Sequence, residues 1–122
     1  MVTEPFIDFG LIKIAEPGRT DTRNVTLPNG AYVIPADIVS ALGEGNTLAG
    51  GAILDKVFTV KKGGGHGVPI IIAGGEYVVS PGDCRNLGGG NVKKGHEILD
   101  KFVLTTRKKT ISELKNLPGP QK

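Results

Sequence analysis

The chain contains one motif twice, 45 residues apart. Residues 30–58 read GAYVIPADIVSALGEGNTLAGGAILDKVF, and residues 75–103 read GEYVVSPGDCRNLGGGNVKKGHEILDKFV. A repeat of this period is typical of a duplicated supersecondary unit that cannot bury its own apolar face alone. Two copies are too few for a solenoid, but they suffice for one globule with a pseudo-twofold core. The positions that are identical in both copies are Gly30, Tyr32, Val33, Leu42, Gly43, Gly45, Asn46, Gly50, Ile53, Leu54, Asp55 and Lys56.

Each copy predicts a β-hairpin, a short helix and a longer helix. In the first copy, Asn29-Gly30 separates two β-rich runs, which is a strong hairpin signal. Helices are then predicted over 36–42 and 47–58, with Gly43 ending the first and Asn46 capping the second. The apolar positions that we expect the second helix to bury are Leu48, Ile53, Leu54 and Val57.

The second copy follows the same plan and ends in a longer helix. Ser80-Pro81 predicts an N-cap and a first-turn proline, and Asn91 predicts the cap of a helix that reaches about residue 116. Two such units bury their apolar faces most simply as an α+β fold, in which both hairpins form one small antiparallel sheet covered on one face by helices. We therefore expect an extended N-terminal arm over 1–24 and a single domain over 25–122. Its repeats span 25–58 and 68–116, and a glycine-rich loop over 59–67 joins them.

Composition limits the broad class of protein. With 122 residues, 39% hydrophobic and 22% charged, the chain fits one soluble globular domain. The single Cys84 excludes an internal disulfide. The first residues lack the pattern of a signal peptide, and no apolar run approaches the ~20 residues of a membrane span. We expect synthesis under cytosol-like conditions and no membrane partner.

The charge is uneven along the chain. Residues 1–90 carry seven Lys/Arg and nine Asp/Glu, whereas residues 91–122 carry eight and three. Such asymmetry is typical of a segment that meets an acidic partner or nucleic acid, although a solvated helix face with a basic tail is the simpler interpretation. The basic residues proposed for partner binding are Lys101, Arg107, Lys108, Lys109 and Lys115. A nucleic-acid interface would use Lys93, Lys94, Lys101, Arg107, Lys108 and Lys109.

No motif predicts catalysis, a cofactor or a metal. The glycine run 88–95 precedes a helix but lacks the phosphate-loop spacing. Its glycines recur in the first copy, which favours structural roles at helix ends and loops and a close helix contact at Gly50 and Gly95.

His66 and His96 with one cysteine are too few for a zinc site, and a Cys84–His96 nucleophile pair lacks an orienting group. The simpler interpretation is a small buried thiol at Cys84 and a surface imidazole at His96. We therefore predict that the chain is not an enzyme.

The recurring polar residues favour a structural role. Asp55 and Asp100 occupy one repeat position, as do Tyr32 and Tyr77. An acid–base pair and a stacking platform for nucleic acid are the functional alternatives. Recurrence in both copies instead favours a hydrogen bond to the neighbouring hairpin or a local ion pair for the aspartates, and packing for the tyrosines.

The phrases GAYVIPADIVSALGEGNT, GGEYVVSP and GHEILDKFV, followed by LPGP near the end, resemble a repeat of tailed-bacteriophage proteins. That repeat occurs in segments of tape-measure proteins and in small virion-associated proteins. The resemblance covers residues 18–120, and it is distinctive in sequence but says little about role. The second copy departs from it, with residues 80–82 reading Ser-Pro-Gly where the first copy has Pro-Ala-Asp at 35–37.

The resemblance implies a structural component of the virion, assembled in the host cytoplasm, with no enzymatic residues to carry over. We expect a capsid decoration or cement protein that binds the major capsid protein, or else a neck or tail adaptor. Self-association is left open, and nucleic-acid binding through the basic helix is the alternative of another class. The arm residues expected to contact the partner are Phe6, Ile7, Phe9, Leu11 and Ile12.

Overall fold

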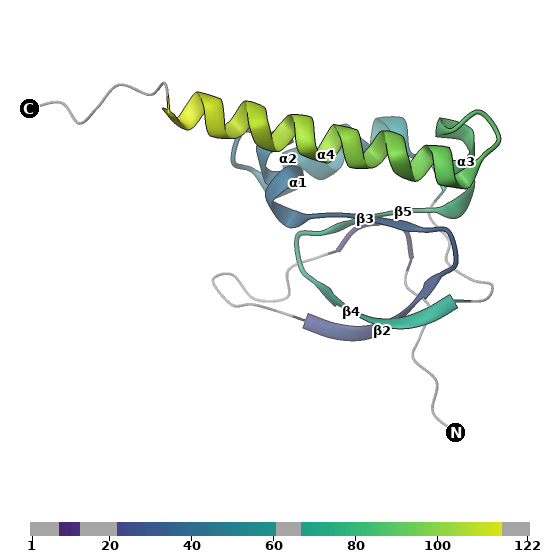
Figure 1. Ribbon diagram of the computed structural model, residues 1–122. Helices are drawn as coiled ribbons and strands as arrows, with labels where there is room; N and C mark the ends of the chain where they lie inside the picture. Colours follow the sequence, from purple (N-terminus) through teal and green to yellow (C-terminus); the bar gives the residue numbers. More distant parts are fainter. Residues whose placement is uncertain (1–7, 13–21, 61–66, 116–122) are drawn as a thin grey trace, which may run out of the picture.

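The computed structural model describes residues 8–12, 22–60 and 67–115 (Figure 1). They form an α+β fold with helices over a small antiparallel sheet, which confirms the predicted class. The strands are β1 (Gly10–Leu11), β2 (Thr22–Pro28), β3 (Tyr32–Ile34), β4 (Gly67–Ala73) and β5 (Tyr77–Val79). The helices are α1 (Ala36–Leu42), α2 (Thr47–Val57), α3 (Pro81–Leu87) and α4 (Val92–Lys115).

The two copies of the repeat are related by a pseudo-twofold axis. Each element from β2 to α2 begins 45 residues before its counterpart from β4 to α4. The strands pair across the copies, β2 with β4 and β3 with β5, both antiparallel. In each pair one residue faces its own repeat equivalent, Val25 opposite Ile70 and Val33 opposite Val78. The axis therefore passes through both strand pairs.

The predicted pairing of strands within each hairpin is wrong. The tight turn forms, with the Ala31 amide donating to the Pro28 carbonyl at 3.1 Å and Gly30 at a φ of +90°. However, the strands on either side of the turn enter different sheets, so the single four-stranded sheet divides into sheets of three and two strands. The reason is that β3 and β5 carry apolar residues on both faces. A second layer must cover the face that the helices leave open.

The chain thus forms three layers with two small cores. Figure 1 shows the helices over the β1–β5–β3 sheet, and the β2–β4 ribbon below it. Side chains alternate along β5: Tyr77 and Val79 enter the core under the helices, while Val78 enters the core above the ribbon. All three are fully buried, because each face of this strand is covered.

Part of the predicted arm belongs to the folded body. β1 extends the sheet beside β5, with Gly10 opposite Val78 and Leu11 opposite Tyr77. The amide of Ile12 donates to the Glu76 carbonyl at 2.8 Å. The second segment of the predicted arm that the structure describes, 22–24, begins β2. The other arm residues, and positions 61–66 of the predicted glycine-rich loop, lie outside the described residues.

Glycines bring the two helices of each copy together. A Cβ on Gly50 would lie 1.8 Å from the carbonyl oxygen of Val39 in α1, and one on Gly95 would lie 1.9 Å from that of Cys84 in α3. The close helix contact predicted at these glycines is therefore confirmed. The caps are confirmed too: the side chains of Asn46 and Asn91 accept from amides in the first turns of α2 and α4, at 3.0 and 3.1 Å.

Candidate interaction surface

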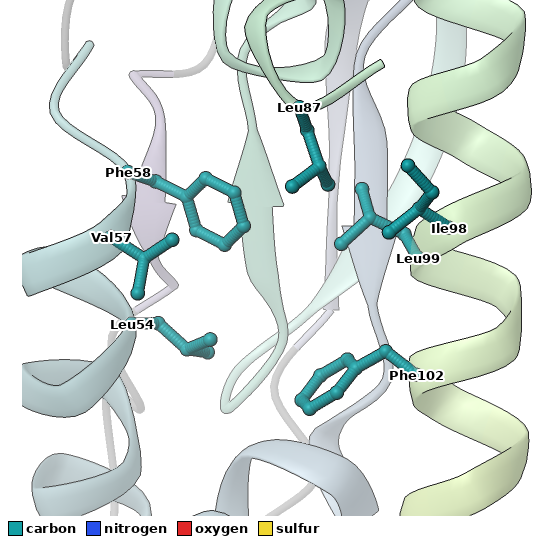
Figure 2. Close-up of a pocket in the computed structure, with 7 residues that line it drawn as sticks. All are labelled: Leu54, Val57, Phe58, Leu87, Ile98, Leu99 and Phe102. Carbon is teal, nitrogen blue, oxygen red and sulfur yellow. The ribbon is translucent and has the colours of Figure 1, made fainter. Parts of the chain in front are cut away.

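An apolar groove lies between α2 and α4. Figure 2 shows side chains from both helices, with Leu87 at the end of α3, converging on it. Its volume is about 260 Å³. Every lining side chain is apolar: Leu54, Val57, Phe58, Leu87, Ile98, Leu99 and Phe102. We call this site the interhelical groove.

The groove departs from the predicted burial of α2. Of the four apolar positions that we expected this helix to bury, only Leu54 is buried, at 4% exposure. Ile53 and Val57 are 44% and 60% exposed, and Leu48 is 74% exposed. The repeat equivalent of Ile53 on α4, Ile98, is 43% exposed. The apolar stripe of α2 is wider than the surface it covers, because the sheet beneath is only three strands wide.

Lysines lie beside the groove on its α4 side. Lys101 follows Ile98 by three residues on α4, so the two share a helix face. Lys94 lies one turn before Ile98 on the same face, and both lysines are exposed. They give the groove a positive edge along α4. On α2 the repeat equivalents, Ile53 and Lys56, are not among the lining residues.

The aspartates next to these lysines are directed away from the groove by tyrosines. The Tyr77 hydroxyl donates to Asp55 at 2.6 Å, and the Tyr32 hydroxyl donates to Asp100 at 2.7 Å. Each bond joins the sheet strand of one copy to the long helix of the other. Burial, helped by the neighbouring carboxylate, raises the pKa of both tyrosines. The hydrogen bond to the neighbouring hairpin that was predicted for the aspartates is confirmed. The two bonds attach α2 and α4 to the sheet on either side of the groove.

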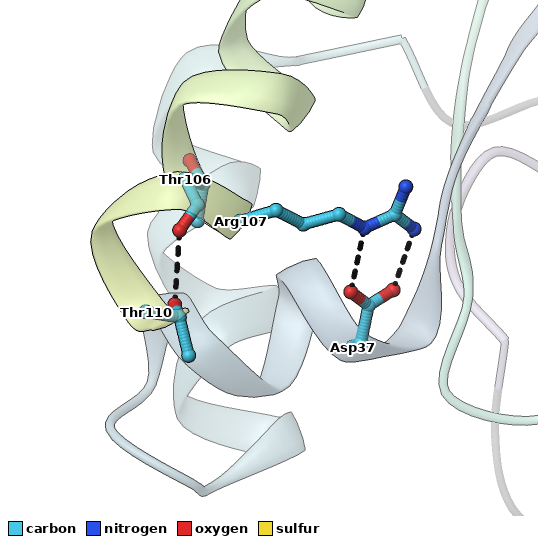
Figure 3. A network of polar contacts seen from close by, with 4 residues as sticks. All are labelled: Asp37, Thr106, Arg107 and Thr110. Carbon is cyan, nitrogen blue, oxygen red and sulfur yellow. Dashed lines mark hydrogen bonds and ion pairs between the residues drawn. The ribbon is translucent and has the colours of Figure 1, made fainter. Parts of the chain in front are cut away.

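The C-terminal half of α4 is held on α1 by an ion pair. The guanidinium of Arg107 donates to both carboxylate oxygens of Asp37, at 2.8 and 2.9 Å (Figure 3). The bonds to Arg107 hold the pKa of Asp37 below its usual range. One turn on, the Thr110 hydroxyl donates to the Thr106 carbonyl at 2.9 Å. Arg107, predicted to face a partner, therefore has its partner within the chain.

The other predicted basic residues lie along α4 and do not converge on one point. Lys101, Lys108 and Lys109 are exposed. Lys94, Lys101 and Lys108 recur every seven residues and form a stripe on one side of the helix. Lys115 is the last residue of α4.

The predicted arm contacts are divided by the fold. Phe9 and Ile12 are 9% and 4% exposed and lie in the core above the β2–β4 ribbon. Leu11 packs against the core under the helices. These three side chains contact their own chain in this structure. Phe6 and Ile7 lie outside the described residues.

Two further candidates from the sequence have structural environments. Cys84 is fully buried, as predicted, and burial raises the pKa of its thiol to about 11, so the thiol stays protonated at neutral pH. His96 is half-buried rather than on the surface. Its Nε2 lies 2.7 Å from the carbonyl oxygen of Gly30, and its ring meets the Tyr32 ring edge-on at 5.3 Å. His66 lies outside the described residues.

Among the described residues, no cluster of three or more His, Cys, Asp or Glu is arranged to hold a metal ion. Within the same residues, no helix has both the length and the apolar character needed to cross a membrane. No protein-family model, no curated protein and no solved structure matches the chain.

The interhelical groove is the feature that sequence reasoning missed. The sequence did contain a signal for it, because α2 and α4 have more apolar residues than one buried helix face requires. Ile53 in α2 and Ile98 in α4 occupy one repeat position, and Val57 and Phe102 occupy another. An excess that recurs in both copies indicates a shared surface rather than two separate cores.

Proposed function

We propose that this chain is a structural protein of a bacteriophage virion, bound as a decoration protein to the major capsid protein. The observation that carries the proposal is the interhelical groove, whose lining residues Val57 and Ile98 remain in contact with solvent. Exposed apolar side chains gathered in one place are typical of a surface that binds another protein. The resemblance of the repeat to virion-associated proteins supplies the setting.

Purified particles of the phage that encodes the chain provide the test. The chain should co-purify with them, and it should rebind to particles that lack it. Ile98→Asp should reduce the bound fraction strongly, because a carboxylate in an apolar contact is costly to desolvate. Ile111→Asp is the matched control, because Ile111 is also exposed on α4, at 51% against 43% for Ile98, but does not line the groove. Absence of the chain from particles would overturn the proposal.

Two details of the attachment can be separated in the same assay. Phe6 and Ile7 remain predicted contacts, and deletion of residues 1–7 tests them without removing β1. The position of the chain in particle maps distinguishes the two virion roles. Sites repeated over the shell favour a decoration protein, whereas a ring at one vertex favours a neck or tail adaptor.

A second candidate function is nucleic-acid binding, which the stripe of Lys94, Lys101 and Lys108 favours. A basic stripe along one helix is the expected electrostatic footprint of such a protein. Binding to duplex DNA should then weaken steeply as salt rises, because each phosphate contact releases a counterion. Absent or salt-insensitive binding at low ionic strength would remove this candidate.

A further inference from the structure

The turn that precedes β3 contains a site of covalent modification. Asn29-Gly30 is the only Asn–Gly pair in the sequence, and every other asparagine precedes valine, threonine or leucine. We propose that Asn29 undergoes spontaneous deamidation, and that the turn and its contact with His96 control the rate. This reaction is a property of the chain itself and does not depend on the proposed function.

The reaction joins two groups that are neighbours in the chain. The backbone nitrogen of Gly30 bonds to the side-chain carbon Cγ of Asn29, and the side-chain nitrogen leaves as ammonia with the proton of the Gly30 amide. Water then opens the resulting five-membered succinimide ring. Opening at the side-chain carbonyl gives aspartate, whereas opening at the main-chain carbonyl gives isoaspartate. Glycine favours ring closure because it has no side chain to hinder the approach of the two groups.

Both reacting groups lack hydrogen bonds within the part of the chain that the structure describes. The Asn29 side chain is exposed, and neither its amide nor the Gly30 N–H is bonded to a described residue. The side chains of Asn46 and Asn91, by contrast, accept hydrogen bonds from the helices that they cap, at 3.0 and 3.1 Å. Asn29 therefore combines an unbonded side chain with an unbonded amide on the residue that follows.

The turn holds the two reacting groups apart. The Ala31 amide donates to the Pro28 carbonyl at 3.1 Å. Gly30 has a φ of +90°, whereas the φ of Asn29 is not positive. These features define a type II turn with Asn29 and Gly30 at its centre. Ring closure places the Gly30 nitrogen against Cγ, and the central peptide of a type II turn must turn over before it can reach that position.

Contacts with the second copy determine how readily the turn opens. Nε2 of His96 lies 2.7 Å from the Gly30 carbonyl oxygen. A Cβ on Gly30 would lie 3.3 Å from Pro81 and 3.4 Å from Val92, so the turn also packs against the first residues of α3 and α4. Turning over the central peptide displaces Gly30 and works against these contacts. Loss of the His96 contact should therefore speed the reaction.

The isoaspartate product changes the place where the turn meets the second copy. Its main chain runs through the former side chain, so one carbon is added between the Cα of Asn29 and Gly30. The added carbon moves Gly30 away from His96, whereas aspartate leaves the length of the main chain unchanged. The isoaspartate form should unfold at a lower urea concentration than the wild type. Asn29→Asp reproduces the other product and should unfold at the wild-type concentration.

Incubation of the folded protein at mildly alkaline pH tests the proposal. Peptide mapping by mass spectrometry measures the conversion of each asparagine, and chromatography separates the aspartate and isoaspartate peptides. Asn29 should convert before any other asparagine, and faster still when the chain is unfolded in urea. His96→Ala should raise the rate in the folded protein about fivefold, the factor that corresponds to losing a hydrogen bond of ordinary strength.

The second copy supplies a control for the site itself. Gly74 occupies the position of Asn29, and the equivalent turn still forms there, with the Glu76 amide donating to the Ala73 carbonyl at 3.3 Å and Gly75 at a φ of +91°. Asn29→Gly should therefore keep the turn and remove the reacting side chain. The peptide that contains the turn should then show no conversion.

Gly51→Ala is the matched control for His96→Ala, because Gly51 occupies the equivalent repeat position and an added Cβ there meets Leu11 rather than the turn. It should leave the rate at Asn29 unchanged. An unchanged rate in His96→Ala, or an equal rise in both variants, would overturn control by the turn. Faster conversion of another asparagine, or no conversion of Asn29 in the folded protein, would overturn the site. An isoaspartate form as stable as the wild type would contradict the part played by the turn contact.

Discussion

The two copies of the repeat share their strands, helices and helix contacts, but they differ in the residues and segments that surround these elements. In the first copy, Gly51 leaves room beneath α2 for Leu11, so β1 adds to the sheet on that side. In the second copy the equivalent residue is His96, which contacts the Gly30 carbonyl instead. After Val57 the first copy leaves the helix, whereas α4 continues to Lys115. The tyrosines and aspartates that join the two copies are the same in both. Residues that differ, such as Gly51 and His96, give the α2 side and the α4 side of the molecule different neighbours.

The largest expected effect on stability comes from substituting the glycines at which the two helices of each copy touch. Gly50→Ala and Gly95→Ala each place a Cβ less than 2 Å from a backbone carbonyl oxygen of the neighbouring helix. Neither helix of the pair can yield without moving its backbone, so we expect each variant to lose about 3 kcal/mol or more of unfolding free energy. Urea unfolding measures this loss, and the two variants should behave alike.

Gly82→Ala is the control for these glycines. It lies in α3, and the nearest atom to an added Cβ is 3.8 Å away. Alanine should fit there and stabilise the helix slightly, by about 0.5–1 kcal/mol. If Gly50→Ala lowered the free energy of unfolding no more than Gly82→Ala, the close helix contact at Gly50 would not contribute to the stability of the fold.

The next effect concerns the tyrosine–aspartate bonds that join the copies. Tyr77→Phe should cost about 2 kcal/mol and Tyr32→Phe about 1 kcal/mol, because Tyr77 is fully buried and Tyr32 only partly so. Each variant keeps the ring and removes only the hydroxyl. Chemical unfolding at neutral pH gives both values, and equal costs would show that burial does not distinguish the two bonds.

The same bonds give the protein an alkaline limit. The pKa of both tyrosines is raised in the fold above the ordinary ~10. Their stabilising contribution is therefore present below about pH 10 and lost as pH rises above it, since the unfolded chain ionises first. Because these are the only two tyrosines, the near-ultraviolet titration of the native protein reports them directly. Titration at the ordinary value would contradict the bonds.

The sequence predicted local structure better than pairing. The caps at Asn46 and Asn91, and the glycine contacts at Gly50 and Gly95, depend on neighbours within one copy, and they were predicted correctly. Strand pairing depends on which layer covers each face of the sheet. A turn signal such as Asn29-Gly30 fixes the turn but not the sheet that each strand enters. The Pro28–Ala31 turn therefore formed as expected while β2 paired with β4.

The candidate site was harder to predict than the fold for a related reason. Helical periodicity marks Ile53 and Val57 as one apolar face but does not say whether another element covers it. Here the narrow sheet covers Leu54 and leaves its neighbours exposed. Likewise, charge spacing could not reveal that Arg107 pairs with Asp37, because the two residues lie 70 positions apart.

A smaller effect sharpens the difference between the copies. His96→Ala removes the 2.7 Å contact between His96 Nε2 and the Gly30 carbonyl oxygen. We expect it to lower the free energy of unfolding by about 1 kcal/mol. Gly51→Ala, at the equivalent place, would put a Cβ 2.9 Å from the end of the Leu11 side chain, which can move. We expect a comparable cost of about 1 kcal/mol, with the disturbance at β1. Hydrogen exchange should show faster exchange at β1 in Gly51→Ala. In His96→Ala it should show faster exchange at the turn around Gly30, which precedes β3.

The smallest effect is expected where α4 extends beyond the repeat. The Arg107 and Asp37 side chains are 44% and 57% exposed, so solvent screens their attraction, and Asp37→Asn should cost less than His96→Ala. The sign with pH follows from the lowered pKa of Asp37. The stabilisation is present above the ordinary aspartate value of ~3.9 and is lost as pH falls through the lower folded pKa. The difference in stability between wild type and Asp37→Asn should therefore close at acid pH, and raised salt should shrink it at neutral pH. A difference that persists in acid and in high salt would mean that packing, rather than the ion pair, holds the extension of α4 on α1.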